Sequence, residues 1–217
     1  MPELRRIVAV LPVLLILVVA VGCQAGRFST PASAYTFREV PAPSGQQFPV
    51  TYNYGCRSYK MLTLTSADET ALAAFFAPAP VSAADERVRV SRAVAWCETT
   101  MGARAGTDGD IAGTVTGTFM KNQQDCVDES MNTTTYMLLM ERLGHLTHHT
   151  VKGPSQRANF AIIKFPHWTA VLTETQTGID WSVDSWFYDN GIEPEVQPLS
   201  RWRSFKRPPA HPLPAIE

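Results

Sequence analysis

The segment HWTAVLTETQTGIDWSVD, residues 167–184, decides the fold because apolar and polar residues alternate in it on both sides of the turn sequence ETQT. Alternation with a period of two, together with many β-branched and aromatic residues, is typical of half-buried strands. We therefore predict an antiparallel hairpin made of residues 167–173 and 178–184. The segment THHTV, residues 147–151, has the same composition and predicts a further strand.

The register of this hairpin follows from keeping its apolar residues on one face. A four-residue turn pairs Trp168 with Val183, Ala170 with Trp181, and Leu172 with Ile179. The other face then carries His167 directly opposite Asp184, with Cβ atoms about 4.5–5.5 Å apart, which allows an imidazole–carboxylate hydrogen bond. A slip of one residue would mix the two faces. Asp180 and Asp189 are the alternative acids, and neither falls opposite His167 in this register.

Helical patterns precede the strands in the chain. Residues 66–77 begin with Ser66 and carry Glu69 three positions later, which is a capping-box pattern before an apolar run. Residues 82–102 and the segment that follows Asp125 are also predicted to be helical, and they end at Gly102 and Gly144. Helices first and strands second predict an α+β domain in which N-terminal helices pack on an antiparallel sheet.

Composition limits the classes of function. The chain has 217 residues, which suits a single domain, and 45% of them are hydrophobic, including five tryptophans. Its formal net charge of -1 gives no basic surface for nucleic acid. The cysteine spacing fits no metal site, and no cofactor is expected.

The N-terminus is predicted to be an export signal. Two arginines precede an unbroken apolar stretch, residues 7–21, which is too short for a typical membrane span of about 20 residues. The stretch ends in AVGC and resembles the lipobox of bacterial lipoproteins, in which Cys23 would be lipidated, although Ala20 stands where leucine is usual. A cleaved secretory signal and a retained anchor are the alternatives. We expect an exported, membrane-anchored lipoprotein of the cell envelope, on the periplasmic side, with the outer membrane favoured by Gln24.

Four segments are predicted along the chain. Residues 1–23 are the signal peptide with its lipobox-like end, and residues 24–46, rich in Pro, Ser, Ala and Gly, form a linker. The domain covers residues 47–206. Residues 207–217 are proline-rich and form a flexible tail, so that His211 within it is a poor candidate for chemistry.

Three cysteines remain if Cys23 carries lipid. An oxidising compartment favours pairing, and a disulfide between Cys56 and Cys97 would leave Cys126 as the free thiol. Three buried reduced cysteines are the alternative, because free cysteine is often a core residue.

Cys126 follows Asp125, which can cap a helix and place the thiol in its first turn. The positive end of a helix favours a thiolate. The carboxylates of Asp128 and Glu129 oppose this ionisation. A nucleophilic cysteine therefore needs a partner that becomes a cation, and histidine is the natural one.

Five histidines compete for this role. His145, His148 and His149 form the pattern H-x-x-H-H, which could hold a metal, but no third type of ligand lies nearby in the sequence and surface or supporting roles are favoured. His167 is the better candidate because it begins a predicted strand.

Three motifs carry a resemblance to a known family. DCVDE (125–129), PHWTAV (166–171) and VDSWF (183–187) follow one another as in the bacterial transglutaminase-like, papain-like cysteine peptidases. The resemblance implies that Cys126 is the nucleophile, His167 the general base and acid, and Asp184 the residue that orients His167. It further implies an oxyanion hole formed by the Cys126 backbone N–H and an upstream side chain, for which Gln124 is the candidate.

We therefore expect an envelope-anchored cysteine hydrolase, a peptidase or amidase that cleaves a peptide or protein substrate through an acyl-enzyme. Acyl transfer to an amine, as in transglutaminases, uses the same intermediate and remains an alternative. A non-catalytic lipoprotein that binds ligands is a second alternative, and it would apply if the three residues came together by chance.

Overall fold

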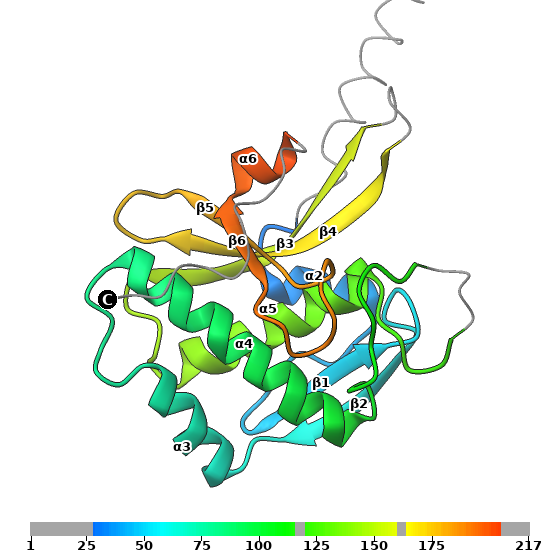
Figure 1. Cartoon of the computed structure of the whole chain (residues 1–217), viewed down its shortest axis with the longest axis horizontal. Coiled ribbons are helices and arrows are strands. Elements are labelled where there is room, and N and C mark those ends of the chain that lie inside the picture. Colours follow the sequence, from blue (N-terminus) through cyan, green and yellow to red (C-terminus); the bar gives the residue numbers. More distant parts are fainter. Residues whose placement is uncertain (1–27, 116–119, 160–163, 205–217) are drawn as a thin grey trace, which may run out of the picture.

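The computed structural model describes residues 28–115, 120–159 and 164–204. Within them the chain is a mixed α+β protein with five helices and two antiparallel sheets, as the sequence predicts at this level (Figure 1). The larger sheet has the strand order β3-β4-β5-β6, with the bounds His149–Asn159, Lys164–Glu174, Asp180–Asp184 and Glu195–Pro198.

The register of the β4–β5 hairpin differs from the predicted one by two residues. Ala170 pairs with Val183 and Leu172 pairs with Trp181, because the connection between the strands, residues 175–179, makes its turn one residue later than expected: the Glu174 backbone N–H donates to the Ile179 carbonyl. It contains Gly178 at a φ of +70°, a left-handed conformation that glycine adopts at little cost. A shift of two residues leaves every side chain on its own face of the sheet.

The shift overturns one detail of the predicted site. The pairing of β4 with β5 runs from Thr173 opposite Asp180 to Ala170 opposite Val183. His167 and Asp184 lie beyond this last pair and are not directly opposed. The apolar face is otherwise as expected, since Ala170, Leu172 and Val183 are buried. Ile179 is the exception, because it belongs to the connection and is 47% exposed.

Three helices supply most of the remaining core. They are α3 (Ser66–Phe75), α4 (Ala83–Ala105) and α5 (Cys126–Arg142). Helix α5 contacts both sheets and lies between them in Figure 1. The cap of α3 is Thr65 rather than Ser66, and α4 continues to a left-handed cap at Gly106 rather than ending at Gly102.

Two N-terminal elements were not predicted. Strands β1 (Gln47–Tyr52) and β2 (Ser58–Thr63) form a hairpin before the first long helix. Helix α2 (Pro31–Arg38) lies inside residues 24–46, and the prediction of a linker is therefore wrong for this stretch. Its Tyr35 is buried, and the hydroxyl lies 2.6 Å from the Thr135 hydroxyl on α5.

The C-terminal part of the described chain adds strand β6 and the short helix α6 (Leu199–Arg203), whose Trp202 is fully buried. The predicted signal peptide with Cys23 and the predicted tail lie outside the described residues. No helix in the described part is long and apolar enough to cross a membrane.

The predicted disulfide is absent. Cys56 and Cys97 are free, buried thiols that belong to different apolar clusters, Cys56 beside α2 and Cys97 in the main core. These two cysteines are therefore buried and reduced, as the alternative to a disulfide predicts.

Candidate active site

Cys126 is the first residue of α5, as predicted from its sequence. The Asp125 carboxylate caps the helix by accepting hydrogen bonds from the backbone N–H groups of Val127 and Asp128, at 3.0 and 3.1 Å. The Asp128 carboxylate accepts from the Asp125 backbone N–H in return. This capping box fixes the helix start and places the thiol, which is partly exposed, over the first turn.

The surroundings of Cys126 hold it as a neutral thiol at rest. Burial raises the pKa of the thiol to about 12, and the charges of Asp125 and Asp184 add to this, while the Trp168 backbone N–H acts in the opposite direction. Trp168 directly follows His167 on β4, so the sulfur faces the strand position next to the predicted base. Ionisation at neutral pH therefore requires a group that takes the proton.

His167 and Asp184 form a buried pair. The His167 Nε2 donates to Asp184 Oδ2 at 2.7 Å, and both residues are less than 10% exposed. The other ring nitrogen, Nδ1, is buried and has no hydrogen-bond partner among the described residues. Because the carboxylate fixes the proton on Nε2, the neutral ring presents a lone pair at Nδ1.

Aromatic rings enclose this imidazole. Trp186, Phe187 and Trp202 have ring centroids 4.7, 5.1 and 5.6 Å from that of His167. The Trp186 indole is itself fixed by donating to the Thr114 carbonyl at 2.8 Å. Apolar walls limit water at the ring and strengthen the charge interactions of the pair.

Trp202 also contacts the pair directly, which sequence reasoning missed. Its Nε1–H donates to Asp184 Oδ2 at 2.6 Å, so the indole and the imidazole share one carboxylate oxygen. The Arg157 guanidinium lies over the Trp202 ring at 4.3 Å from its centroid. A lone tryptophan after a short strand gives no sequence signal for this role.

Gln124, the candidate oxyanion donor, is oriented by a relay of hydrogen bonds. The Thr51 backbone N–H donates to Asn132 Oδ1, and Asn132 Nδ2 donates to the Thr51 carbonyl, which fixes how the Asn132 amide is turned. The same Nδ2 donates to Gln124 Oε1 at 2.7 Å. The Gln124 amide therefore keeps its Nε2–H₂ end available, and this end makes no hydrogen bond among the described residues.

The carboxylates expected to oppose a thiolate lie in buried positions. Burial raises the pKa of Asp128 and of Glu129 well above the usual range. Glu129 accepts from the Ser185 hydroxyl at 2.9 Å and lies beside Asp110, whose pKa burial raises to about 6. These acids therefore hold protons more tightly than usual, and their opposition to a thiolate is weaker than the sequence predicts.

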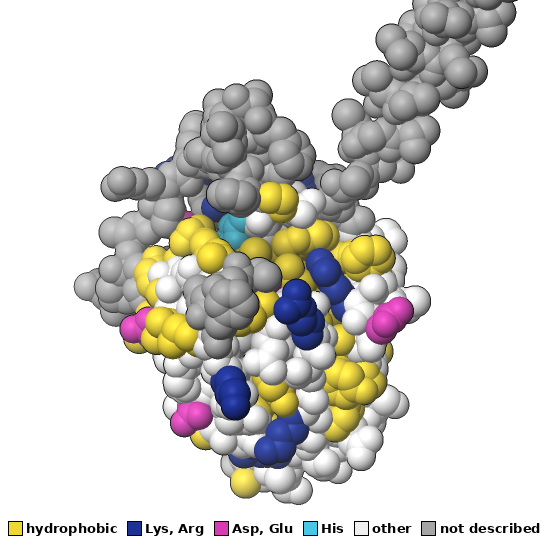
Figure 2. Space-filling model, turned by 90° about the vertical axis from the view of Figure 1, so that its right-hand side faces the viewer, with side chains coloured by type: hydrophobic (Ala, Val, Ile, Leu, Met, Phe, Trp, Pro, Cys, Tyr) yellow, Lys and Arg dark blue, Asp and Glu magenta, His cyan; other side chains and the backbone are white. Residues whose placement is uncertain are grey.

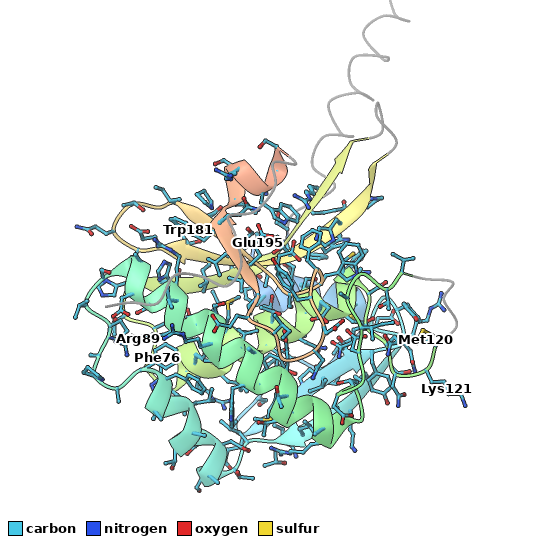
Figure 3. All side chains as sticks on the ribbon, viewed as in Figure 1. Phe76, Arg89, Met120, Lys121, Trp181 and Glu195 are labelled. Atoms are coloured by element: carbon cyan, nitrogen blue, oxygen red, sulfur yellow. The ribbon has the colours of Figure 1, made fainter. Side chains whose placement is uncertain are left out.

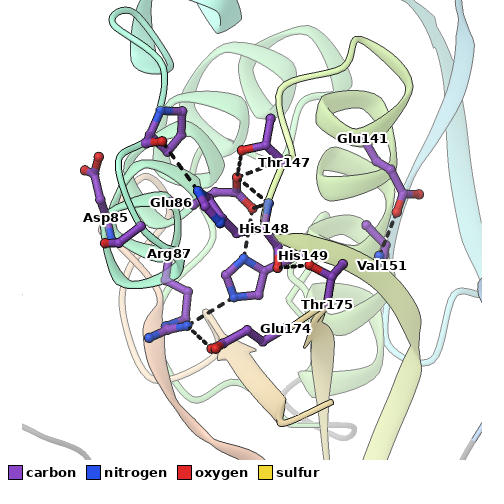
Figure 4. A network of polar contacts seen from close by, with 12 residues as sticks. Asp85, Glu86, Arg87, Glu141, Thr147, His148, His149, Val151, Glu174 and Thr175 are labelled. Carbon is purple, nitrogen blue, oxygen red and sulfur yellow. Dashed lines mark hydrogen bonds and ion pairs between the residues drawn. The ribbon is translucent and has the colours of Figure 1, made fainter. Parts of the chain in front are cut away.

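The H-x-x-H-H histidines lie away from this site. Figure 4 shows His149 in a network with Glu86, Arg87 and Glu174 at the other end of β3 and β4. His145 stacks on Phe76. No group of three metal-binding side chains occurs in the described ranges.

No protein-family model matches this chain, and no curated protein or solved structure gives a significant match. The geometry of the site itself indicates the chemistry. That geometry combines a thiol at a helix start, an imidazole with one nitrogen open, and a carboxylate that fixes the other nitrogen.

Proposed function

We propose that this protein is a cysteine hydrolase of papain-like, transglutaminase-like type that cleaves amide bonds in peptide or protein substrates. The observation that carries the proposal is the state of His167, whose Nε2 is bound by Asp184 while Nδ1 is buried and open, one residue from the amide that faces the Cys126 thiol. Catalytic dyads require this arrangement of an oriented base beside a nucleophile.

The reaction would proceed in two stages. His167 Nδ1 takes the thiol proton as Sγ of Cys126 attacks the substrate carbonyl carbon, and Asp184 stabilises the imidazolium that forms. The attack leaves a negative charge on the former carbonyl oxygen of the substrate. This oxygen accepts hydrogen bonds from the Cys126 backbone N–H, which the Asp125 cap leaves unused, and from the Gln124 Nε2–H₂ group. The C–N bond then breaks, and Nδ1–H protonates the leaving amine.

Hydrolysis completes the cycle. His167 Nδ1 takes a proton from water, which attacks the thioester carbon, and the C–S bond breaks to release a carboxylic acid and the thiol. An amine in place of water would give transglutamination, which uses the same residues. Lipidation at Cys23 would hold the domain at the cell envelope, facing the periplasm.

Alkylation of the full-length protein in detergent by iodoacetamide, followed by mass spectrometry, tests the proposal. We expect fast, pH-dependent labelling at Cys126, whereas Cys56 and Cys97 serve as internal controls because both are buried and free. In Cys126→Ala the fast phase should disappear while the melting temperature changes little, since a partly exposed first-turn thiol contributes little packing. Labelling of Cys126 no faster than a buried thiol would contradict catalysis and favour a binding module. Incorporation of dansylcadaverine into casein would identify acyl transfer.

A further inference from the structure

Arg38 is a cation that forms no ion pair among the described residues, and it contacts Trp168, whose backbone N–H faces the candidate nucleophile. It lies in the last turn of α2, and its guanidinium carbon lies 5.3 Å from the ring centroid of Phe37 and 5.2 Å from that of Trp168. Contact with two rings restricts the guanidinium plane and leaves its N–H edge free to donate.

Within the described ranges of the chain, the guanidinium of Arg38 makes no hydrogen bond. Its Nε is buried without a hydrogen-bond partner, and no carboxylate lies within ion-pair distance of Arg38 among the described residues. Arg38 lies close enough to Cys56 to act on the charge of its thiol, and the acids that do the same are Asp128 and Asp125. Asp128 tends to be neutral because burial raises its pKa, and Asp125 is engaged in capping α5. A buried donor without a partner is unusual in folded proteins and calls for an explanation.

The position of Arg38 relative to the site suggests that explanation. Trp168 carries the guanidinium on its ring, while its backbone N–H faces the Cys126 thiol. Val127, the residue after Cys126, packs in the apolar cluster that contains Ala34 of α2. A substrate lying over Cys126 would therefore come within reach of α2.

The side of the molecule that carries Lys121, on the loop before α5, has charges favourable to an anion. Figure 2 shows Lys and Arg side chains among apolar ones at the centre of the face, with Asp and Glu side chains towards its margins. Lys121, on the loop that leads into α5, projects at this side of the molecule in Figure 3. Potentials of one sign over a site attract ligands of the other.

We infer that Arg38 binds a carboxylate of the substrate, so that the enzyme prefers peptides with an acidic side chain beside the scissile bond. This inference rests on the proposed function. A guanidinium can hold a carboxylate through two parallel N–H···O bonds, which gives both energy and geometric selection. It cannot do the same for the isosteric amide of glutamine without leaving a donor facing a donor.

Paired affinity labels of the same shape test this inference on the full-length protein. The labels are chloromethyl ketones of acetyl-Glu and acetyl-Gln, with a second pair, acetyl-Glu-Ala and acetyl-Gln-Ala, that places the acid one residue further from the ketone. We expect one Glu label to alkylate Cys126 about 10-fold faster than its Gln counterpart, as one charge-assisted hydrogen bond allows. In Arg38→Met this ratio should fall to about one. Arg38→Lys should give an intermediate ratio because it keeps the charge but loses the paired donors.

Arg57→Met is the matched control, since Arg57 is an exposed arginine in the β1–β2 turn and its loss changes the net charge equally. It should leave the Glu-to-Gln ratio unchanged. Should Arg38→Met fail to fold, Arg38→Gln provides the uncharged variant. Equal rates for Glu and Gln labels in the natural protein, with Cys126 still alkylated, would overturn the inference alone. No alkylation of Cys126 by these labels or by iodoacetamide would overturn the proposed function itself.

Discussion

Two buried histidine–carboxylate pairs lie in the described part of the chain, and they differ in the use of one nitrogen atom. His167 bonds Asp184 at 2.7 Å, and His149 bonds Glu86 at 2.9 Å through Nδ1. The His149 Nε2, however, lies 3.1 Å from the Arg87 guanidinium, so both ring nitrogens of this histidine are occupied (Figure 4).

The difference separates a structural pair from a candidate catalytic one. Glu86 is further bound by the backbone N–H groups of Thr147 and His148, which ties α4 to the start of β3. Every partner in that network is satisfied, and such networks stabilise a fold. His167 instead keeps a buried nitrogen without a partner among the described residues, and it directly precedes Trp168, whose backbone N–H faces the Cys126 thiol. An unpartnered buried nitrogen costs stability and is typical of functional sites. A histidine close to an acid is therefore weak evidence for catalysis, whereas an open second nitrogen near a nucleophile is much stronger evidence.

Replacing His167 by glutamine should have the largest effect. Without a base, we expect alkylation of Cys126 at pH 7 to slow by about 10³-fold, within the range of general-base contributions. The rate in the variant should rise steeply with pH towards the thiol pKa of about 12, whereas the rate in the natural protein should depend less on pH because His167 takes the thiol proton during the attack. A pH–rate profile of iodoacetamide labelling measures both effects.

The melting temperature of His167→Gln is the control for this experiment. It should change by only a few degrees, because among the described residues the imidazole is hydrogen-bonded to Asp184 alone. Its loss therefore leaves no second group without a partner. Equal labelling rates in His167→Gln and the natural protein would show that the open nitrogen has no role at Cys126.

Replacing His149 by leucine should lower stability instead of activity. It leaves Glu86 and Arg87 without their buried partner, and we expect the free energy of unfolding to fall by about 3 kcal/mol. The partners of Glu86, led by His149, hold its pKa below the usual range against the opposing effect of burial. This group therefore stabilises the fold above its unfolded pKa, and the contribution is lost as pH falls through the lower, folded value. Urea unfolding at pH 7 and pH 4 should show a smaller acid-side loss in the variant. A large loss of labelling in molecules that remain folded would contradict the structural assignment.

The sequence was informative wherever local chemistry decides the structure. The Asp125 cap and the helix start at Cys126 depend on residues adjacent in the chain, and both are confirmed. The pairing of His167 with Asp184 was also predicted correctly, but from the wrong register. Alternation of apolar and polar residues fixes the faces of a hairpin, yet it cannot distinguish registers that differ by two residues, since both keep the same faces.

Contacts between distant segments could not be predicted. Helix α2 has no clear signal in its own sequence, because its stability depends on Tyr35 reaching α5 and because its Thr30 cap pairs with Ser33 instead of an acidic residue. The closeness of Arg38 to Trp168 follows from the same packing. Neither leaves a periodic pattern in the sequence.

Trp202→Phe should have the smallest effect of the three and test the finest part of the comparison. The Asp184 Oδ2 atom accepts from both the Trp202 indole and His167, whereas the described partners of Glu86 are His149 and the residues Thr147 and His148, with no indole among them. Phenylalanine keeps the aromatic body and removes only the N–H, so Asp184 loses one of two donors that hold it in place. We expect alkylation of Cys126 to slow by about 10-fold, as loss of one hydrogen bond to a charged group predicts.

Trp181→Phe is the matched control, because the buried Trp181 Nε1 has no hydrogen-bond partner among the described residues. It should leave the labelling rate unchanged. Proton NMR distinguishes positioning from a loss of packing: the His167 Nε2–H resonance should move in Trp202→Phe and stay in place in Trp181→Phe, because only the former alters the acceptor of that proton. An unmoved resonance together with a lowered melting temperature would reduce Trp202 to a packing residue. The distinction between the two histidine pairs would then depend on the open Nδ1 of His167 alone.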